Sequence, residues 1–495
     1  MVVVVALGCR VNHQDIETWK GTVKGPGKIV AVLEAERYPL PLRAQAAMAL
    51  VEMEHPEVEG VPELLKSMGR LDTATRHAVL KQMLPELFEL MKEEVEAEEG
   101  EGADSKKGVD TPPPPSTAAV RAKDTAYHLI AHAAQAEREQ LIDAVVAWFA
   151  RDFNGRSRSG DVSSEQVMKS VGERAAVQLV EALDAKMPPA ALVKLAELIG
   201  QQGGDKSKAE AAARLVAIEK EMRSAAFLQW IEQRLRGQVA GQKVDEKRLK
   251  QGAELNRAVY IDEGLIASMK HLADQEVVRV RLMAMATQKS SSDTEAERRK
   301  KALQALEGNV GEAQLKALTA LALSAGAPPG VRDYAFDRIG DIRSRKTLPA
   351  LWPLLQGGAQ GRVRARVGEL ILAIGGRSVV AEFFQRLPSP EGGYPPQELE
   401  GYAQRLSQMS PPPSTLVRGQ LASEAWWKQV IALRFLERRG ERADVQRMQA
   451  LVASTTMLQG KGWPKDKTLG AVAKESIQAL KERLEQPGSQ PSRGD

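Results

Sequence analysis

Residues that commonly carry out chemistry are scarce in this chain of 495 residues, which has six histidines and one cysteine. Only His128 and His132 have a spacing that suits a metal, because residues four apart share one face of a helix. A zinc site needs a third and usually a fourth ligand, and Glu137 is a nearby acid of the right type. No His-Glu-x-x-His motif supplies such a set, so we expect no metal site.

The segment from Lys24 to Lys28, Lys-Gly-Pro-Gly-Lys, has the composition of a phosphate-binding loop but not its spacing. Thr22 stands where the first glycine of such a loop is required, and Ile29 replaces the Ser or Thr after the lysine. We expect a tight turn at the start of a helix instead. The chain also lacks a Gly-x-Ser-x-Gly nucleophile turn and the kinase signatures. We therefore expect no catalytic residue and no cofactor.

Composition narrows the class of protein further. Apolar residues make up 43% of the chain, which is too many for a wholly disordered protein. The formal net charge of +4 is too small over this length to indicate nucleic acid by itself. No run of about 18 apolar residues is present, so we expect no membrane-spanning helix. Ala, Leu, Glu, Lys, Arg and Gln dominate, and these residues lose little rotamer freedom in a helix.

Apolar residues recur at the same offsets in several segments. Offsets of 0, 4, 7, 8 and 11 place apolar side chains on one stripe of a 3.6-residue helix. These segments are Leu42, Ala46, Ala49, Leu50 and Met53; Val363, Val367, Leu370, Ile371 and Ile374; Val331, Ala335, Ile339 and Ile342, with Arg338 at offset 7; and Trp427, Ile431 and Phe435. In the first three the opening apolar residue is followed by arginine, namely Arg43, Arg364 and Arg332.

A Pro or Gly turn and another apolar helix precede these segments, and Val331 and Val363 lie 32 residues apart. Such a helix pair cannot bury both faces alone, so pairs stack into arrays. The pattern resembles short HEAT repeats over 25–92 and 310–455, and more weakly over 118–309. The resemblance implies an all-α fold, an α-solenoid of HEAT-like hairpins forming a curved rod. HEAT-like hydroxylases use His-Glu dipeptides, which this chain lacks.

The arginine that follows the first apolar residue has two interpretations. In the structural one it pairs with an acid or caps a carbonyl of the neighbouring repeat. In the functional one it belongs to a basic ladder on the concave face. We favour the structural interpretation, because packing between repeats is needed throughout an array.

Composition shifts divide the chain into segments. Glu-rich and Pro-rich sequence indicates a linker, and Asn154–Ser164 is typical of a mobile loop. Within 118–309 the helices look longer, especially over 206–236, so we expect this middle region to depart from regular stacking. The expected divisions are 1–24, signal and tether; 25–92, HEAT-like repeats; 93–117, acidic and Pro-rich linker; 118–309, irregular helical repeats; 310–485, HEAT-like repeats; and 486–495, disordered tail.

The N-terminus carries the sole cysteine. Met1 to Gly8 are apolar or small and lead directly to Cys9. This resembles the lipobox of bacterial lipoproteins, in which a small residue precedes the cysteine that becomes lipidated. The resemblance implies lipid attachment at Cys9 and an envelope, membrane-anchored location. Leu7 and Ala6 are in the reverse of the usual order, and no Lys or Arg precedes the apolar stretch. A start codon further upstream would explain the missing basic residues.

Charge is unevenly placed, because residues 325–450 contain 18 Lys and Arg but 12 Asp and Glu. HEAT-like DNA glycosylases bind duplex on a basic face, so seven arginines are candidate phosphate contacts, and Trp426–Trp427 is a candidate stacking pair. The arginines are Arg362, Arg364, Arg366, Arg434, Arg438, Arg439 and Arg442. Nucleic acid remains the least favoured partner, since whole-chain charge is near neutral and Trp427 lies on a core stripe.

These observations together predict a non-catalytic scaffold that binds other proteins and is held at a membrane by lipid on Cys9. A soluble cytoplasmic HEAT-like scaffold is the alternative, and a nucleic-acid-binding solenoid is the third. The sequence does not identify the protein partner.

Overall fold

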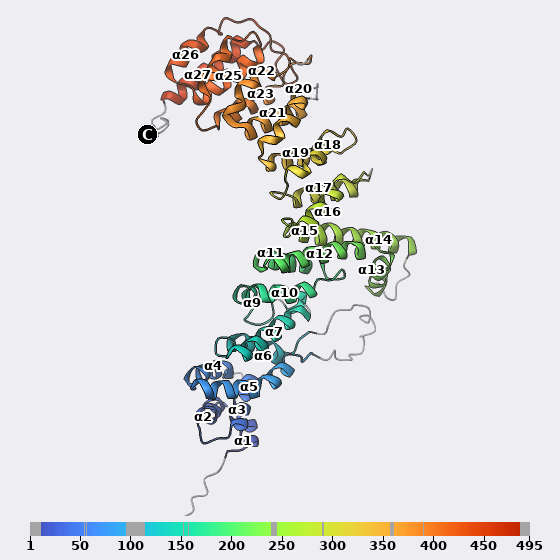
Figure 1. Ribbon diagram of the computed structural model, residues 1–495, viewed down its shortest axis with the longest axis vertical. Helices are drawn as coiled ribbons and strands as arrows, with labels where there is room; N and C mark the ends of the chain where they lie inside the picture. Colours follow the sequence, from blue (N-terminus) through green and yellow to red (C-terminus); the bar gives the residue numbers. More distant parts are fainter. Residues whose placement is uncertain are drawn as a thin grey trace, which may run out of the picture. The chain divides into compact units, whose positions relative to one another are not determined.

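The computed structural model describes residues 11–53, 55, 57–95, 114–151, 153–156, 158–238, 245–289, 292–356, 361–389 and 391–485. Helices account for the regular structure of these residues, which contain two isolated β-bridges and no named strand (Figure 1). The all-α expectation is therefore confirmed. The chain divides into two compact units, Met1–Leu282 and Met283–Asp495.

The first unit is built from helices that pack in consecutive layers. They are α1 (His13–Lys20), α2 (Gly25–Glu34), α3 (Leu40–Glu52), α4 (Gly60–Arg70), α5 (Thr73–Leu90), α6 (Thr117–Leu129), α7 (Gln135–Arg151), α8 (Phe153–Arg156), α9 (Ser164–Val171), α10 (Glu173–Glu181), α11 (Pro189–Gln202), α12 (Asp205–Met222), α13 (Ala225–Gln238), α14 (Glu246–Val259), α15 (Ile266–Lys270) and α16 (Glu276–Thr287), within which the unit boundary falls.

The second unit contains the remaining helices. They are α17 (Asp293–Ala305), α18 (Glu312–Leu323), α19 (Pro329–Ile342), α20 (Leu348–Gln356), α21 (Gly361–Gly375), α22 (Val380–Arg386), α23 (Pro396–Ser407), α24 (Ser414–Gly419), α25 (Trp426–Arg439), α26 (Arg442–Gln449) and α27 (Leu469–Glu485).

Local sequence explains where these helices begin. Pro329 and Pro396 stand in the first turns of α19 and α23, where proline's fixed φ suits a helix and its missing N–H costs nothing. Side chains at other N-termini accept bonds from free backbone N–H groups, as Ser116 Oγ does from Ala119 N at 2.9 Å. These residues favour the observed helix starts through local interactions, without help from tertiary packing.

The helices stack through a shared apolar seam. In the second unit α17, α19, α21, α23, α25 and α27 contact one another in turn, and α18, α20, α24 and α26 each cover one of them. In the first unit α3, α5, α7, α10 and α12 form an equivalent series. The predicted stripe residues Val331, Ile339 and Ile431 are fully buried in it. This is the HEAT-like solenoid arrangement that the sequence predicts.

Several stripe positions differ from the simple pattern. Val363 and Ile374, at the two ends of the α21 stripe, are only half-buried. Arg338, which interrupts the α19 stripe, is nevertheless buried because its guanidinium donates to the Leu303 carbonyl at 3.3 Å. A polar residue is therefore accommodated in the seam where it meets a helix end.

The middle of the chain contains the longer helices that the sequence predicts. Residues 206–236 lie in two of them, α12 of 18 residues, which ends at Met222, and α13 of 14 residues, which begins at Ala225. The α13–α14 hairpin then departs from the regular layers, and a π-helical turn follows at Tyr260–Leu265 (Figure 1). The expectation for 154–164 is corrected: this segment is not simply a mobile loop, since α8 ends at Arg156, whose side chain is fully buried.

Three expectations concern residues outside the described part of the chain. These are Cys9 and its apolar leader, most of the acidic and Pro-rich linker, and the 486–495 tail. Among the described residues, none of the helices combines the length and the apolarity that crossing a bilayer requires.

The close approach of α21 and α23 gives a test of the seam. A Cβ on Gly368 would lie 2.4 Å from Tyr402 Cε1, and Tyr402 is fully buried. We expect Gly368→Ala to destabilise the second unit by about 1–3 kcal/mol, although alanine favours helix over glycine by about 1 kcal/mol. The matched control is Gly419→Ala in α24, where no heavy atom lies within 4 Å of the added Cβ. Urea unfolding followed by circular dichroism measures both, and equal stability of the two variants would contradict the packing.

Candidate functional site

Arginines from neighbouring helices cap helix ends in both units. The last four carbonyls of a helix have no partner within it, and a guanidinium offers several donors. Arg439 of α25 donates to the Ser407 carbonyl at the end of α23 at 2.8 Å. Arg483 of α27 does the same for the Glu437 carbonyl of α25 at 3.0 Å. In these two cases a helix completes the hydrogen bonding of the helix one layer earlier.

Arginines that follow the first stripe residue take part in this scheme. Arg43 is buried and donates from Nε to the Leu33 carbonyl at 2.7 Å, near the end of α2. Arg364 is buried and pairs with Glu398 of α23. The structural interpretation is confirmed for these two residues, with one refinement: Arg43 caps the first helix of its own hairpin.

The Arg364–Glu398 pair lies at the centre of a buried polar cluster. Arg364 Nε and Nη2 lie 2.6 and 2.7 Å from the two Glu398 carboxylate oxygens. Tyr402 donates to Glu398 Oε1 at 2.8 Å, and the Tyr394 ring lies 4.3 Å from the guanidinium carbon. Burial raises the pKa of Tyr402 well above its usual value, and the Glu398 charge adds to this effect. Burial alone would lower the pKa of Arg364, but the hydrogen bonds to Glu398 raise it. Arg364 therefore remains positively charged beside Glu398.

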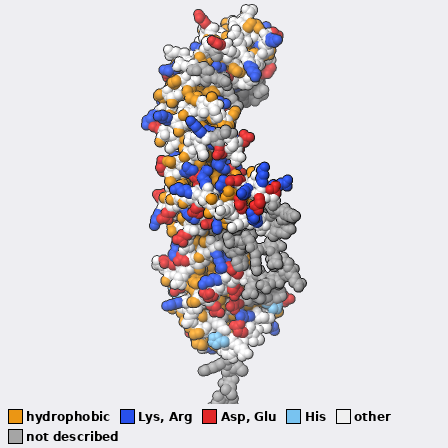
Figure 2. Space-filling view, turned by 90° about the vertical axis from the view of Figure 1, so that its right-hand side faces the viewer, with side chains coloured by type: hydrophobic (Ala, Val, Ile, Leu, Met, Phe, Trp, Pro, Cys, Tyr) orange, Lys and Arg blue, Asp and Glu red, His pale blue; other side chains and the backbone are white. Residues whose placement is uncertain are grey.

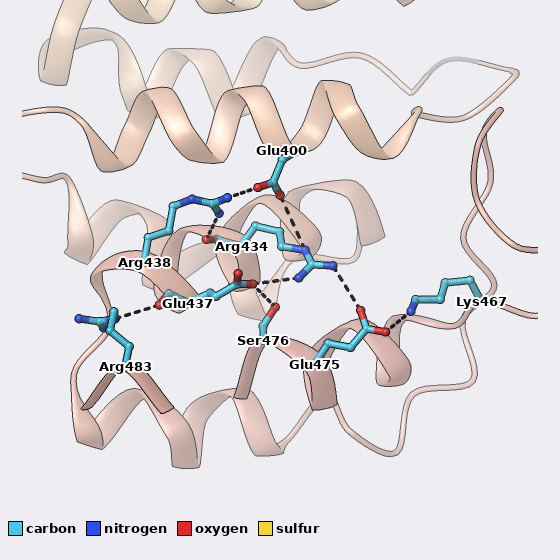
Figure 3. A network of polar contacts seen from close by, with 8 residues as sticks. All are labelled: Glu400, Arg434, Glu437, Arg438, Lys467, Glu475, Ser476 and Arg483. Carbon is cyan, nitrogen blue, oxygen red and sulfur yellow. Dashed lines mark hydrogen bonds and ion pairs between the residues drawn. The ribbon is translucent and has the colours of Figure 1, made fainter. Parts of the chain in front are cut away.

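A second group of charges lies on the outward sides of the stacked helices, and we call it the charged row. Its members are Asp337 of α19, Arg366 and Glu369 of α21, Glu400 of α23, Arg434, Glu437 and Arg438 of α25, and Glu475 of α27. Figure 3 shows its last part, in which Arg434 reaches carboxylates from three helices. Arg434 lies 2.9 Å from Glu437, 3.3 Å from Glu475 and 3.8 Å from Glu400. Arg438 also pairs with Glu400.

The charged row contains three arginines and five acids, and the two helices that carry its arginines, α21 and α25, alternate with helices that contribute acids only. Arg366, for example, pairs with Asp337 on the preceding helix and with Glu369 on its own helix. Figure 2 likewise shows Lys and Arg interspersed with Asp and Glu on the face in view. Half-exposed pairs of this kind contribute about 0–1 kcal/mol each, so their presence does not account for stability.

The candidate phosphate contacts do not form an open basic face. Arg364 is buried, Arg366, Arg434 and Arg438 are matched by carboxylates, and Arg439 is used as a helix cap. Arg442 is exposed, and the Arg362 side chain lies outside the described residues. A phosphate would have to displace carboxylates that already hold these guanidinium groups.

The tryptophan pair is also unsuited to base stacking. Trp426 is 9% exposed and Trp427 is half-buried, with their rings 5.9 Å apart and nearly perpendicular. The Trp427 ring packs 5.7 Å from the Tyr394 ring, which places it in the core beside the buried cluster. The core interpretation of the Trp427, Ile431 and Phe435 stripe is confirmed.

The structure does not place His128 and His132 on one face of a helix. α6 ends at Leu129, so His128 is in the helix while His132 lies in the following turn. The two imidazoles therefore do not share a helical face. The described residues contain no group of three His, Cys, Asp or Glu side chains placed to hold a metal ion.

The Lys24–Lys28 segment is the helix start that its sequence predicts. Gly25 N donates to the Thr22 carbonyl at 2.8 Å in a tight turn, and α2 begins at Gly25 with Pro26 in its first turn. No strand precedes it among the described residues around it, so it is not a phosphate loop.

Sequence reasoning missed the acids that complete these clusters. Glu398 follows Arg364 by 34 residues and Glu400 precedes Arg434 by 34, close to the repeat length. An acid one repeat away from an arginine was the available signal.

Comparison with known proteins finds similarity to solved structures only. No protein-family model matches the chain, and no curated protein matches it. Solved structures of the karyopherin Kap121p align over most of it: Kap121p bound to Pho4p at TM-score 0.35 and 13% identity, and Kap121p alone at 0.36 and 13%. They cover 98% and 95% of this chain but 49% and 45% of Kap121p. The chain thus spans about half the length of these helical proteins.

The buried ion pair yields a prediction about stability. Removing one partner leaves the other charge buried and unpaired, which costs about 3–5 kcal/mol. We expect Glu398→Ala to destabilise the second unit by that amount. The double variant Arg364→Met with Glu398→Leu replaces the pair by apolar groups and recovers most of the loss. Urea unfolding of both variants tests this, and a double variant no more stable than Glu398→Ala would contradict it.

Proposed function

We propose that this protein is a non-catalytic scaffold that binds other proteins along its stacked helices. Three observations support the proposal. The helices α19, α21, α23, α25 and α27 present an extended series of side chains, and the charged row on them contains both signs. The arginines described above are engaged in capping or pairing. Side chains so engaged maintain the stack, and they do not converge on an open catalytic centre.

The observation that carries the proposal is the alternation of charge across α19, α21, α23, α25 and α27. A row that presents both signs complements another protein surface of mixed charge, and such complementarity favours specificity and register. A polyanion requires uncompensated cations, which the charged row does not offer. Nucleic acid is therefore the weaker alternative for this unit.

The charged row gives a direct test of partner binding. The tagged full chain is used to recover proteins from cell extracts and membranes, and quantitative mass spectrometry compares variants. We expect Arg434→Glu with Arg438→Glu to reduce recovery of specific partners at least five-fold, because like charges then face Glu400 and any acidic partner group. Arg386→Glu is the control, since Arg386 is also paired with a glutamate but is more exposed and lies on α22, outside the charged row.

Unchanged recovery by the row variant would contradict binding at this face. Tight retention of the parent chain on heparin, with a steep dependence on salt, would favour the nucleic-acid alternative instead.

We further propose that lipid on Cys9 holds this scaffold at a membrane of a bacterial envelope. The support is the lipobox-like order of Leu7, Gly8 and Cys9, which lie outside the described residues. More than one acyl chain on one cysteine makes anchoring stable, since each buried methylene contributes about 0.8 kcal/mol. A soluble cytoplasmic scaffold is the alternative location.

Radiolabelled palmitate tests the anchor when the gene is expressed from its own locus, so that any upstream codons are included. We expect label on the parent protein and none on Cys9→Ser, with the variant moving to the soluble fraction. Gly8→Ala retains a small residue before Cys9 and should keep the label. Label that survives Cys9→Ser, or its absence from the parent, would overturn the anchor and leave the scaffold proposal intact.

A further inference from the structure

A groove of about 650 Å³ lies in the second unit between α26 and α27, which pack against each other. This volume falls within the range of about 300–1,000 Å³ that is usual for ligand sites. Its lining residues on α26 follow the spacing i, i+3, i+4 and i+7, and those on α27 follow i, i+3 and i+4. Each set therefore forms one face of its helix, and the two faces together form the groove.

Two kinds of uncharged side chain line the groove. Val445 of α26 and Leu484 of α27 are half-buried and give it a small apolar surface. Gln446 and Gln449 are exposed on α26, and each side-chain amide can both donate and accept a hydrogen bond. The main chain of a peptide also presents donors and acceptors, so this lining suits a peptide better than a simple anion.

The groove has one cation on each of its helices, Arg442 on α26 and Lys481 on α27. Both side chains are exposed. Within the part of the chain that the structure describes, neither side chain forms an ion pair or a hydrogen bond. These two positive charges are therefore available to a ligand.

The acids closest to Arg442 on its own side of the sequence are already paired with other arginines. Glu441 lies 3.4 Å from Arg418. Asp444 lies 2.8 Å from Arg418 and 2.8 Å from Arg447. Burial alone would raise the pKa of Asp444, but its hydrogen bonds lower it, so this carboxylate stays charged and engaged. Neither acid neutralises Arg442.

One acid, Glu485, lies in the lining, four residues after Lys481. It is exposed, and no ion pair joins it to either cation of the groove among the described residues. Burial lowers the pKa of Arg483, two residues after Lys481, and the positive charge of Arg439 lowers it further. The lining thus holds two cations against one acid, with another positive charge near this part of α27.

We propose that the groove between α26 and α27 binds an acidic peptide segment of a protein partner. Its carboxylates pair with Arg442 and Lys481, and an aliphatic side chain between them packs on Val445 and Leu484. The inference rests on the proposed scaffold function and names the chemistry of one partner segment.

Charge complementarity selects this occupant. An uncharged segment would leave both cations of the groove without a partner, and a basic segment would be repelled by them. Nucleic acid is the weaker occupant, because its affinity grows with the number of phosphates that cations neutralise, and the groove offers only Arg442 and Lys481.

The test uses the full chain and a fluorescein-labelled peptide, Glu-Asp-Leu-Glu-Glu, in anisotropy titrations at low salt. We expect a Kd of about 100 µM, because exposed ion pairs and one aliphatic contact each contribute little. Arg442→Glu with Lys481→Glu should weaken binding about ten-fold or more, since attraction becomes repulsion. The matched control is Lys316→Glu with Arg345→Glu, which changes the net charge equally at exposed positions outside the lining. It should alter Kd by less than about two-fold.

A third variant gives a result of the opposite sign. Glu485→Gln removes the one acid of the lining and should strengthen binding of the acidic peptide about two- to three-fold. Damage to the packing of α27 would weaken binding instead. Unchanged or weaker binding by this variant, or equal effects of the groove and control double variants, would overturn the proposal. Circular dichroism verifies that each variant is folded.

Further labelled probes identify the kind of occupant. The basic peptide Lys-Lys-Leu-Lys-Lys should bind about ten-fold more weakly than the acidic one or worse. Equal binding of the basic peptide, or no binding of the acidic peptide up to about 1 mM, would overturn the proposal. Equal or tighter binding of a single-stranded oligothymidylate would overturn it in favour of nucleic acid. Equal or tighter binding of a peptide with the sequence of residues 486–495 would overturn it in favour of the chain's own tail.

Failure of the groove is distinguishable from failure of the scaffold. If the acidic peptide does not bind but the charged-row variant still loses its partners, the scaffold stands and this groove is not its docking site. If the acidic peptide binds while the charged-row variant keeps its partners, the groove is supported and the charged row is not the binding face.

Discussion

Burial of one apolar seam between consecutive helices is the interaction on which the structure depends. A single hairpin of this length leaves an apolar face exposed, and only the next hairpin covers it. In the second unit that face includes Val331, Ile339, Ile371 and Ile431, all fully buried. Positions along the seam also tolerate little change in volume, as the approach of Gly368 to Tyr402 illustrates. The seam therefore fixes the spacing of the helices and, with it, the spacing of every surface group.

Surface charge follows from that spacing. Because α21, α23, α25 and α27 are neighbours, an arginine on one faces acids on the next, and Arg434 meets carboxylates from three helices. The same neighbour relationship explains why the excess of basic residues over 325–450 does not produce a basic face. Net charge along a sequence and net charge on a surface differ here, since the stack brings distant acids beside each arginine.

Much of the fold could be predicted from the sequence because it depends on local periodicity. The stripes at Leu42–Met53 and Val331–Ile342 and the turns before them predict helices that the structure contains. The predicted structural role of Arg43 and Arg364 also holds.

Other features depend on tertiary contacts, which local sequence patterns do not show. One such feature is the end of α6 at Leu129, which separates His128 from His132. Another is the burial of Arg156 within a Gly/Ser-rich segment. The partner acids Glu398 and Glu400 were missed for the same reason, since they lie a repeat away in sequence.

The capping arginines have a consequence for how such a chain can change in length. Arg439 and Arg483 each close the end of the helix one layer earlier, so the final turn of each layer is completed by residues encoded further along the gene. A deletion that removes such an arginine leaves carbonyls in the preceding layer without their hydrogen-bond donor. Removal or duplication of whole layers, cut at the same point in each, keeps every helix end satisfied. Growth and loss in this architecture are therefore constrained to occur in complete modules, with the boundary set by a hydrogen bond as well as by hydrophobic contact.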